Sequence, residues 1–270
     1  MSGPASLNRA LEGSVLVVAH PDDEILWFGS IAADVDKIVI CFLNDPLKPE
    51  LAGIREKTLR AHPWSDKITC LELDETSAFN HAGWPRPETT EFGLRIVKAP
   101  QIEEVYRLCY DKLQELLTPI VRNATNVFTH NPWGEYGHEE HVLVHSVATK
   151  LAVADQKSVW YSNYASTWSE DLMRLYLDKS ERQIFTGKVD TAALEKIADI
   201  YRANGAWTWF DDYTWFADEF FVRGPLTQTG GPGFGWLFPI NLLRLPDREL
   251  PAHGHRKPLL YRAIKRLTGR

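Results

Sequence analysis

The sequence predicts an α/β fold, with an open, mostly parallel sheet covered by helices on both faces and a C-terminal extension. Two observations carry this prediction. Short apolar runs alternate with helix-length segments through residue 164, and the first unit has the order strand, helix, strand. In addition, 270 residues of which 44% are hydrophobic suffice for a sizeable core.

The apolar runs place the expected strands at 15–19, 37–43, 67–73, 126–130 and 158–164. Helices are expected at 22–36, 53–61, 101–121 and 139–154, the third because Ile102, Val105 and Leu108 recur at helical spacing. One more helical region is expected at 180–201. We expect residues 1–165 to form the catalytic core, and residues 166–270 to pack on it and help shape its pocket.

Composition excludes several classes of protein. The net charge of −6 argues against a nucleic-acid partner. Cys41, Cys70 and Cys109 form no paired motif, which is typical of a reducing cytoplasm. We expect no signal peptide and no membrane-spanning helix, because no apolar run is long enough. A cytoplasmic protein is therefore expected.

The segment HPDDE, residues 20–24, follows the first expected strand and opens the first expected helix. His20 and Asp23 lie three residues apart and can converge as ligands for zinc or iron. Asp22 stays close and can serve as a general base. The structural alternative is that Asp22 and Asp23 only cap a helix and that His20 is a strand-end residue.

The segment HEEHVLVH, residues 138–145, also stands where a strand gives way to a helix. His138 and His141 can face the same way, and His145 lies one turn further. Val142 excludes the HExxH motif of zinc proteases. A solvated helix start is the structural alternative. Together the two segments predict one site at the carboxyl edge of the sheet, where two histidines and one carboxylate leave positions open for water and substrate.

These motifs, AHPDDE after one strand and YGHxxH after another, resemble the LmbE-like (PIG-L) N-acetylglucosamine deacetylase family over roughly residues 14–165. The resemblance implies a Rossmann-like fold and a metal-dependent deacetylase, with Zn²⁺ as the metal and Fe²⁺ as an alternative. It also implies roles for individual residues: metal ligands His20, Asp23 and His141, general base Asp22, His138 for the tetrahedral intermediate and the leaving amine, Tyr136 for the oxyanion, and Arg55 for substrate.

The chain departs from the family pattern after His138. Many members have HPDH there, so Glu139 replaces a proline and Glu140 replaces an aspartate that orients His138. Other pocket residues are predicted from position alone. Asn44 and Asp45 follow the second strand, Trp133 can stack on a sugar, and one or two rings of the aromatic segment 205–221 can reach the pocket, while the rest form core.

Some residues have two interpretations. His130 is either a structural strand-end residue or a partner of the site, and His145 is an additional candidate ligand. The glycine-rich segment 230–235 is a lid or a plain loop. The basic tail 256–270 either packs on its own protein or contacts an anionic membrane surface.

The expected activity is removal of the N-acetyl group from an amino sugar of the N-acetylglucosamine type, free or within a glycoconjugate. It would serve glycan, glycolipid or secondary-metabolite biosynthesis. Hydrolysis of another amide or acyl group at the same metal is the alternative within enzymes. A catalytically silent glycan-binding module is the alternative outside them, and the intact set of histidines and aspartates argues against it.

Overall fold

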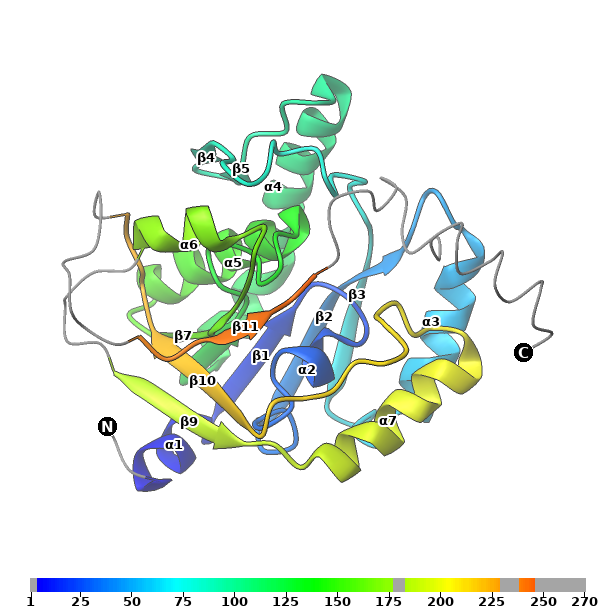
Figure 1. Ribbon diagram of the computed structural model, residues 1–270, viewed down its shortest axis with the longest axis vertical. Helices are drawn as coiled ribbons and strands as arrows, with labels where there is room; N and C mark the ends of the chain where they lie inside the picture. The colour runs from blue at the N-terminus through cyan, green and yellow to red at the C-terminus, as the bar shows by residue number, and fades with distance from the viewer. Residues whose placement is uncertain (1–3, 177–182, 229–237, 246–270) are drawn as a thin grey trace.

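The computed structural model describes residues 4–176, 183–228 and 238–245. Within these residues the central sheet has seven strands in the order β3-β2-β1-β6-β7-β10-β9 (Figure 1). The pairs from β3 to β7 are parallel, and β10 pairs antiparallel with both β7 and β9. The open, mostly parallel α/β sheet that the sequence predicted is confirmed.

The strands of this sheet are β1 (Ser14–Val18), β2 (Lys37–Asn44), β3 (Ile68–Asp74), β6 (Asn126–Thr129), β7 (Ser158–Ser162), β9 (Ile184–Lys188) and β10 (Asp218–Arg223). Two small sheets accompany it. One is the hairpin of β4 (Thr89–Thr90) with β5 (Gly93–Leu94), and the other pairs β8 (Tyr164–Ser166) with β11 (Asn241–Leu243). The helices are α1 (Pro4–Leu11), α2 (Asp23–Leu26), α3 (Glu50–Ala61), α4 (Pro100–Asn123), α5 (Glu139–Ala154), α6 (Glu170–Tyr176) and α7 (Thr191–Asn204).

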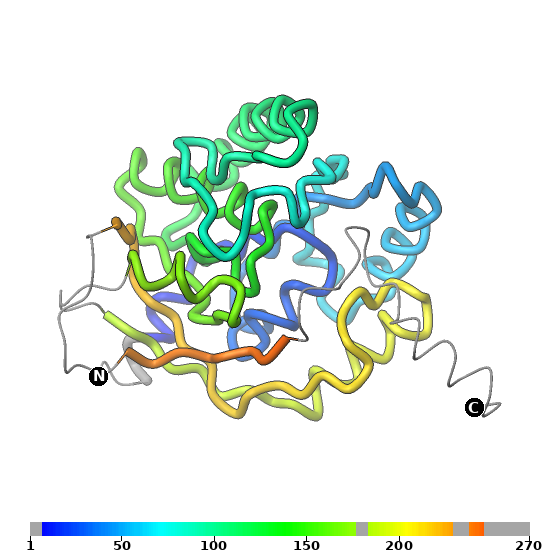
Figure 2. Tube along the Cα trace, turned by 45° about the horizontal axis from the view of Figure 1, so that its top comes forward, coloured from blue at the N-terminus to red at the C-terminus, as the bar shows by residue number. Residues whose placement is uncertain are grey.

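Helices cover both faces because strand residues alternate between them. Val15 and Val17 of β1 pack with the buried stripe of α4 and with α5. Leu16 and Val18 point to the other face, where they belong to the same hydrophobic cluster as Trp27. On that second side α3 and α7 lie next to each other. From a second direction, the green segment with α4 and α5 lies above the blue strands, and the yellow segment with α7 lies below them (Figure 2).

The expected helix at 22–36 is wrong beyond its first turn, because α2 ends at Leu26. The backbone amides of Gly29 and Ser30 donate to the buried Glu219 carboxylate of β10, at 3.2 and 2.9 Å, instead of continuing a helix. Residues 27–36 form turns, whose buried members are Trp27, Phe28, Ile31, Ala32 and Val35. A tertiary partner nearly two hundred residues away therefore decides the end of this helix.

The expected helical region at 180–201 is also partly wrong. Residues 184–188 form the edge strand β9, whose side chains alternate between buried and exposed, and α7 begins only at Thr191. Asp190 begins α7 by accepting a hydrogen bond from the amide of Ala193. Residues beyond 165 thus add β9 and β10 to the central sheet.

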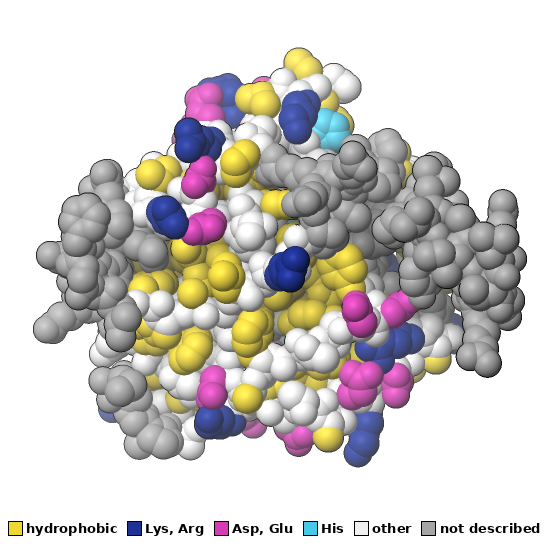
Figure 3. Space-filling model, in the orientation of Figure 1, with side chains coloured by type: hydrophobic (Ala, Val, Ile, Leu, Met, Phe, Trp, Pro, Cys, Tyr) yellow, Lys and Arg dark blue, Asp and Glu magenta, His cyan; other side chains and the backbone are white. Residues whose placement is uncertain are grey.

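The face of the molecule in Figure 3 carries hydrophobic side chains together with acidic and basic ones. On the face shown in Figure 3, acidic and basic side chains gather together over α7, where Arg202 pairs with Glu195 and Asp199. Across residues 4–176, 183–228 and 238–245, no helix has the length and apolar character needed to cross a membrane. The glycine-rich segment 230–235 and the basic tail 256–270 lie outside the described residues.

Candidate metal centre

The carboxyl ends of β1 and β6 lie side by side and bring the two motifs together, as the sequence predicted. His20 and Asp23 follow β1, whereas His141 stands in the first turn of α5 after β6. One side-chain ligand atom of each lies within 4.8 Å of the others, and all three side chains are buried. This is the spacing that a shared metal ion requires.

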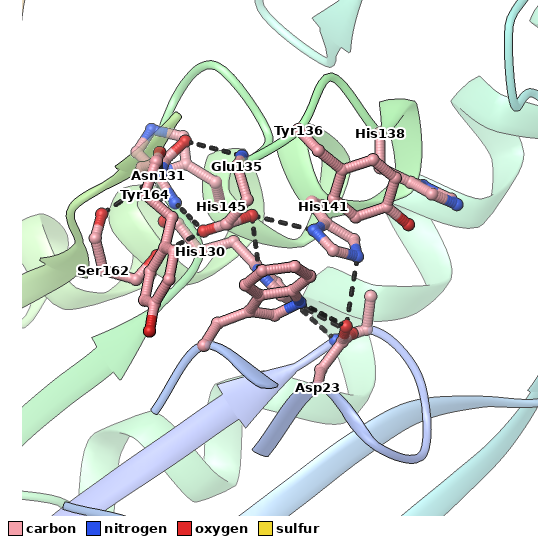
Figure 4. A network of polar contacts seen from close by, with 12 residues as sticks. Asp23, His130, Asn131, Glu135, Tyr136, His138, His141, His145, Ser162 and Tyr164 are labelled. Carbon is pink, nitrogen blue, oxygen red and sulfur yellow. Dashed lines mark hydrogen bonds and ion pairs between the residues drawn. The ribbon is translucent and has the colours of Figure 1, made fainter. Parts of the chain in front are cut away.

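Asp23 lies at the centre of this group. Its Oδ2 accepts a 2.7 Å hydrogen bond from the amide of His20, and its Oδ1 accepts one of 2.8 Å from the indole of Trp27. The same carboxylate lies 3.4 Å from Nδ1 of His20 and 3.4 Å from Nε2 of His141. Figure 4 shows His141 pointing at Asp23. Asp23 is therefore oriented by its neighbours before any ion is bound.

His20 is held from its far side by Glu140. Its Nε2 lies 2.8 Å from Oε2 of Glu140, while its Nδ1 faces Asp23. Glu140 is fixed in turn by the amide and the hydroxyl of Thr76. Glu140, which stands in place of the aspartate of the family pattern, thus directs its carboxylate to His20 and Thr76.

His141 has the same arrangement with a different acid. Its Nδ1 lies 2.8 Å from Oε2 of Glu135, and its buried Nε2 has no hydrogen-bond partner among the described residues. A buried ring nitrogen without a partner is costly unless something else occupies its lone pair. A metal ion beside Asp23 would do so.

The donor set therefore fits a metal. Imidazole nitrogen and carboxylate oxygen are ligands that zinc accepts, and three protein ligands leave a fourth position for water. Histidine ligands of metals commonly hold a carboxylate on the other ring nitrogen, as His20 and His141 do here. Two overlapping groups, His20–His138–Glu140 and His130–Glu135–His141, are also compact, but their glutamates already accept the hydrogen bonds described here.

Glu135 is the main site residue that the sequence analysis missed. Its carboxylate contacts Nδ1 of both His130 and His141, at 2.9 and 2.8 Å. It also accepts from the hydroxyl of Ser162 and the amide of Asn131. Burial opposes ionisation, yet His130 and His141 lower the pKa of Glu135 to about 2. The sequence signal that could have revealed Glu135 is its position as an acidic residue in the turn-rich loop just before the second motif.

Both ring nitrogens of His130 already have hydrogen-bond partners next to the site. Its Nε2 accepts a 2.9 Å hydrogen bond from the amide of Ala19, and its ring stacks on that of His141 with centroids 3.9 Å apart. Of its two interpretations, the one as a partner of the site matches these contacts. His145 lies behind it and donates to the carbonyl oxygen of His130. Among the described residues, His145 belongs to none of the three groups that could hold a metal ion.

Asp22 does not cap α2, which removes the structural alternative for this residue. It occupies the N-cap position, but its carboxylate makes no capping hydrogen bond and its backbone is left-handed, with φ at 92°. The carboxylate instead accepts from the amide and hydroxyl of Thr208, at 3.1 and 2.7 Å. Burial and the nearby charge of Asp23 raise the pKa of Asp22 well above its ordinary value.

Glu24 explains how this backbone conformation is maintained. Its Oε2 accepts a 3.0 Å hydrogen bond from the amide of Asp22, and its Oε1 accepts one of 2.7 Å from the hydroxyl of Tyr201. His62 approaches the same oxygen at 3.3 Å. Glu24 is fully buried and is the structural member of the HPDDE motif.

His138 lines the pocket beside the rings of His20 and His141. Its Nδ1 accepts from the amide of Glu140 at 3.2 Å, and its ring stacks on Phe79 with centroids 4.7 Å apart. Burial and the neighbouring His141 lower the pKa of His138 well below its ordinary value. The neutral ring therefore carries its proton on Nε2, so it can donate a hydrogen bond without being charged.

Tyr136 lies beside His138 and His141 and also lines the pocket. Burial, followed by the charge of Asp23, raises the pKa of Tyr136 well above its ordinary value. Its hydroxyl thus stays protonated as a donor. Figure 4 shows both rings on the α5 side of Asp23.

The outer pocket carries charged groups. Arg55 lines it and donates from Nη1 to Glu75 at 2.6 Å and to the carbonyl of Leu43 at 3.0 Å. Asp45 lines the pocket as well. Asn44 does not, which corrects that prediction. Its side-chain amide turns to β3 and donates to Asp74 and to the backbone of Glu72.

Trp133 is another corrected prediction. Its side chain is fully buried, and its indole N–H donates to the carbonyl oxygen of Tyr164 at 2.6 Å. It has no free face for a sugar. Trp209 of the aromatic segment reaches the pocket instead and packs on Trp27 and Tyr136. The prediction that a ring or two of this segment would reach the pocket is confirmed, while Trp215 and Phe221 belong to the core.

The chain thus has an α/β sheet with a buried site of two histidines and one aspartate at its carboxyl edge. No family model matches the chain. A curated protein of Rhodococcus jostii (strain RHA1), 1D-myo-inositol 2-acetamido-2-deoxy-alpha-D-glucopyranoside deacetylase, is 28% identical over 185 residues, which cover 62% of this chain and 61% of the relative. The match therefore spans about three fifths of that protein. It confirms the resemblance inferred from the two motifs.

Solved structures give weaker similarity. A deacetylase of teicoplanin biosynthesis in complex with bog matches with a TM-score of 0.49 and 11% identity, over 80% of this chain and 99% of that chain. The A40926 pseudoaglycone deacetylase Dbv21 matches with a TM-score of 0.47 and 10% identity, over 80% and 97%. Similarity at this level does not carry function from one protein to another.

Proposed function

We propose that this chain is a zinc-dependent deacetylase that hydrolyses the N-acetyl group of an N-acetylglucosamine-type sugar or glycoconjugate. The observation that carries the proposal is the buried set of His20, Asp23 and His141 with the Asp22 carboxylate beside it. The activity of the Rhodococcus relative supports the same chemistry. Fe²⁺ is the alternative metal, since the same ligand types bind it.

The metal would be held by His20, Asp23 and His141. Zinc in such a site supplies a Lewis acid for the amide carbonyl and lowers the pKa of bound water to about 7. The remaining steps are carried out by side chains that line the pocket: Asp22, His138 and Tyr136.

Asp22 acts as the general base. It takes a proton from the water that attacks the acetyl carbonyl carbon, and its raised pKa suits a group that must accept a proton. The negative charge that develops on the carbonyl oxygen receives hydrogen bonds from the Nε2–H of His138 and the hydroxyl of Tyr136. When the C–N bond breaks, the protonated Asp22 can return the proton to nitrogen, and acetate and the amine leave.

The outer pocket supports a sugar substrate. Sugar rings present hydroxyl groups together with apolar faces, and the pocket offers Arg55, Glu75 and Asp45 beside the ring of Trp209. We propose that these residues bind the sugar and its substituent, in glycan, glycolipid or secondary-metabolite biosynthesis. The three free cysteines suit a cytoplasmic location.

The test is acetate release from a panel of free, inositol-linked and glycopeptide-linked N-acetylglucosamine compounds. We expect activity in the zinc-loaded protein, loss with a chelator, and recovery when Zn²⁺ or Fe²⁺ is restored. Release from simple amides but from no sugar would favour the alternative hydrolase. Sugar binding without turnover under any metal would favour the silent glycan-binding module and refute the proposal.

A further inference from the structure

The segment between α7 and β10, residues 205–217, packs directly on α2 (Figure 1). The indole N–H of Trp215 donates to the carbonyl oxygen of Ile25 at 2.6 Å. The hydroxyl of Tyr213 donates to the carbonyl oxygen of Leu26 at 3.3 Å. These are carbonyl groups at the end of a four-residue helix, which need partners from outside it. The segment is therefore bonded to the helix that carries Asp23.

From this segment Thr208 reaches the Asp22 carboxylate. Its amide and its hydroxyl both donate to Oδ2 of Asp22, at 3.1 and 2.7 Å. Both residues line the pocket. Among the described residues, the hydrogen bonds to this carboxylate all end on Oδ2, so Oδ1 remains for the attacking water.

We propose that Thr208 is a positioning residue for this reaction, which holds the Asp22 carboxylate in the orientation that a general base needs. The inference rests on the proposed function. The torsion that turns a carboxylate is soft, so without a partner the group samples many orientations. Because proton transfer needs close and aligned atoms, loss of the orientation lowers the rate without moving the metal or the substrate.

The backbone of Asp22 has separate support, which makes the inference testable. Glu24 holds the amide of Asp22, and Thr208 holds only its side chain. Thr208→Val removes the hydroxyl, keeps the shape and leaves the backbone N–H. The substitution therefore acts on the carboxylate and leaves the left-handed turn in place.

The experiment compares zinc-loaded Thr208→Val and Thr208→Ser proteins with the parent on the best sugar substrate. We expect Thr208→Val to lower kcat about 10-fold, the usual effect of one hydrogen bond to a charged group, with KM and zinc content unchanged. Thr208→Ser should retain most of the parent rate. In an Asp22→Asn background, Thr208→Val should cause no further loss, because the two residues act as one unit.

Thr118→Val is the matched control, since it removes a threonine hydroxyl that donates to the carbonyl oxygen of Gln114 within α4. It should leave kcat unchanged. A Thr208→Val protein with the parent kcat, or one whose loss persists in the Asp22→Asn background, overturns the inference.

Crystal structures of the zinc-loaded parent and Thr208→Val proteins supply a readout that does not depend on activity. We expect the Asp22 carboxylate to turn away from its parent orientation while His20 and His141 stay in place. An unchanged carboxylate overturns the inference about Thr208. Absence of acetate release by the parent from every sugar overturns the proposed function instead, so the two failures are distinguishable.

Discussion

Glu135 holds His141 through a 2.8 Å contact between Oε2 and Nδ1, and this contact leaves Nε2 of His141 turned toward Asp23. The Glu135 carboxylate thus fixes the orientation of the His141 ring, although it contacts Nδ1 and not the nitrogen that faces Asp23. This relationship, and the parallel one between Glu140 and His20, make the metal centre depend on residues outside the ligand set.

Replacement of Glu135 by glutamine should weaken zinc binding. The amide can still form one hydrogen bond, but it brings no negative charge to Nδ1 of His141, and outer partners of this kind typically contribute 10- to 100-fold in affinity. We expect an increase of about 10-fold or more in the zinc dissociation constant, measured by competition with a chelating dye. Exposed Glu115→Gln on α4 is the control and should bind zinc like the parent. An unchanged affinity in Glu135→Gln would contradict this role.

Asp22→Asn should separate metal binding from turnover. Asparagine keeps the size of the side chain but cannot accept the proton, so kcat should fall by at least about 100-fold. Zinc content, measured by elemental analysis, should stay at the parent level because Asp22 lies outside the ligand set. Near-normal amide hydrolysis would refute the assignment of Asp22 as the base.

Tyr201→Phe should destabilise the protein without removing a ligand. The hydroxyl of Tyr201 donates to the fully buried Glu24, and its loss removes one hydrogen bond from a buried carboxyl group. We expect the free energy of unfolding to fall by about 1–3 kcal/mol in urea titrations. Tyr176→Phe, which removes a more exposed hydroxyl, should change stability by less than about 0.5 kcal/mol. Equal stabilities of the two variants would contradict the role given to Glu24.

The two tryptophans near the site should respond differently. Trp209→Ala removes a pocket wall, so KM for the sugar should rise by about 10-fold, measured by acetate release at varied substrate. Trp133→Phe should leave KM unchanged and lower stability, because the buried carbonyl of Tyr164 loses a donor. A rise in KM for Trp133→Phe alone would restore the sequence-based assignment.

The buried His145 should make stability depend on pH. Burial lowers its pKa to about 4, so between the ordinary value near 6.5 and about 4 the unfolded chain binds more protons than the folded one. Stability is therefore lost as the pH falls through this window, and His145 accounts for about 2 kcal/mol between pH 7 and pH 5. His145→Gln should show a smaller difference in unfolding free energy between these two pH values. An unchanged difference would contradict the prediction.

By itself, the sequence determined the parallel sheet, the position of α5 and the meeting of two motifs at one edge. These features depend on local apolar patterns and on the rule that parallel strands end at the same side. It also predicted a role for Asp22 beyond capping a helix, and the Asp22 carboxylate makes no capping hydrogen bond.

Only the tertiary structure decided which side chains face the pocket. Trp209 lines the pocket whereas Trp133 does not, and of the two expected residues Asn44 and Asp45 the structure places Asp45 there. The Glu140 carboxylate contacts His20, Thr208 contacts Asp22, and Glu135 contacts His141. Glu219 likewise ended the helix expected at 22–36. The physical reason is common to all of them. A buried polar group takes the partner that the fold places nearest to it, and the local sequence around either residue does not say which partner that is.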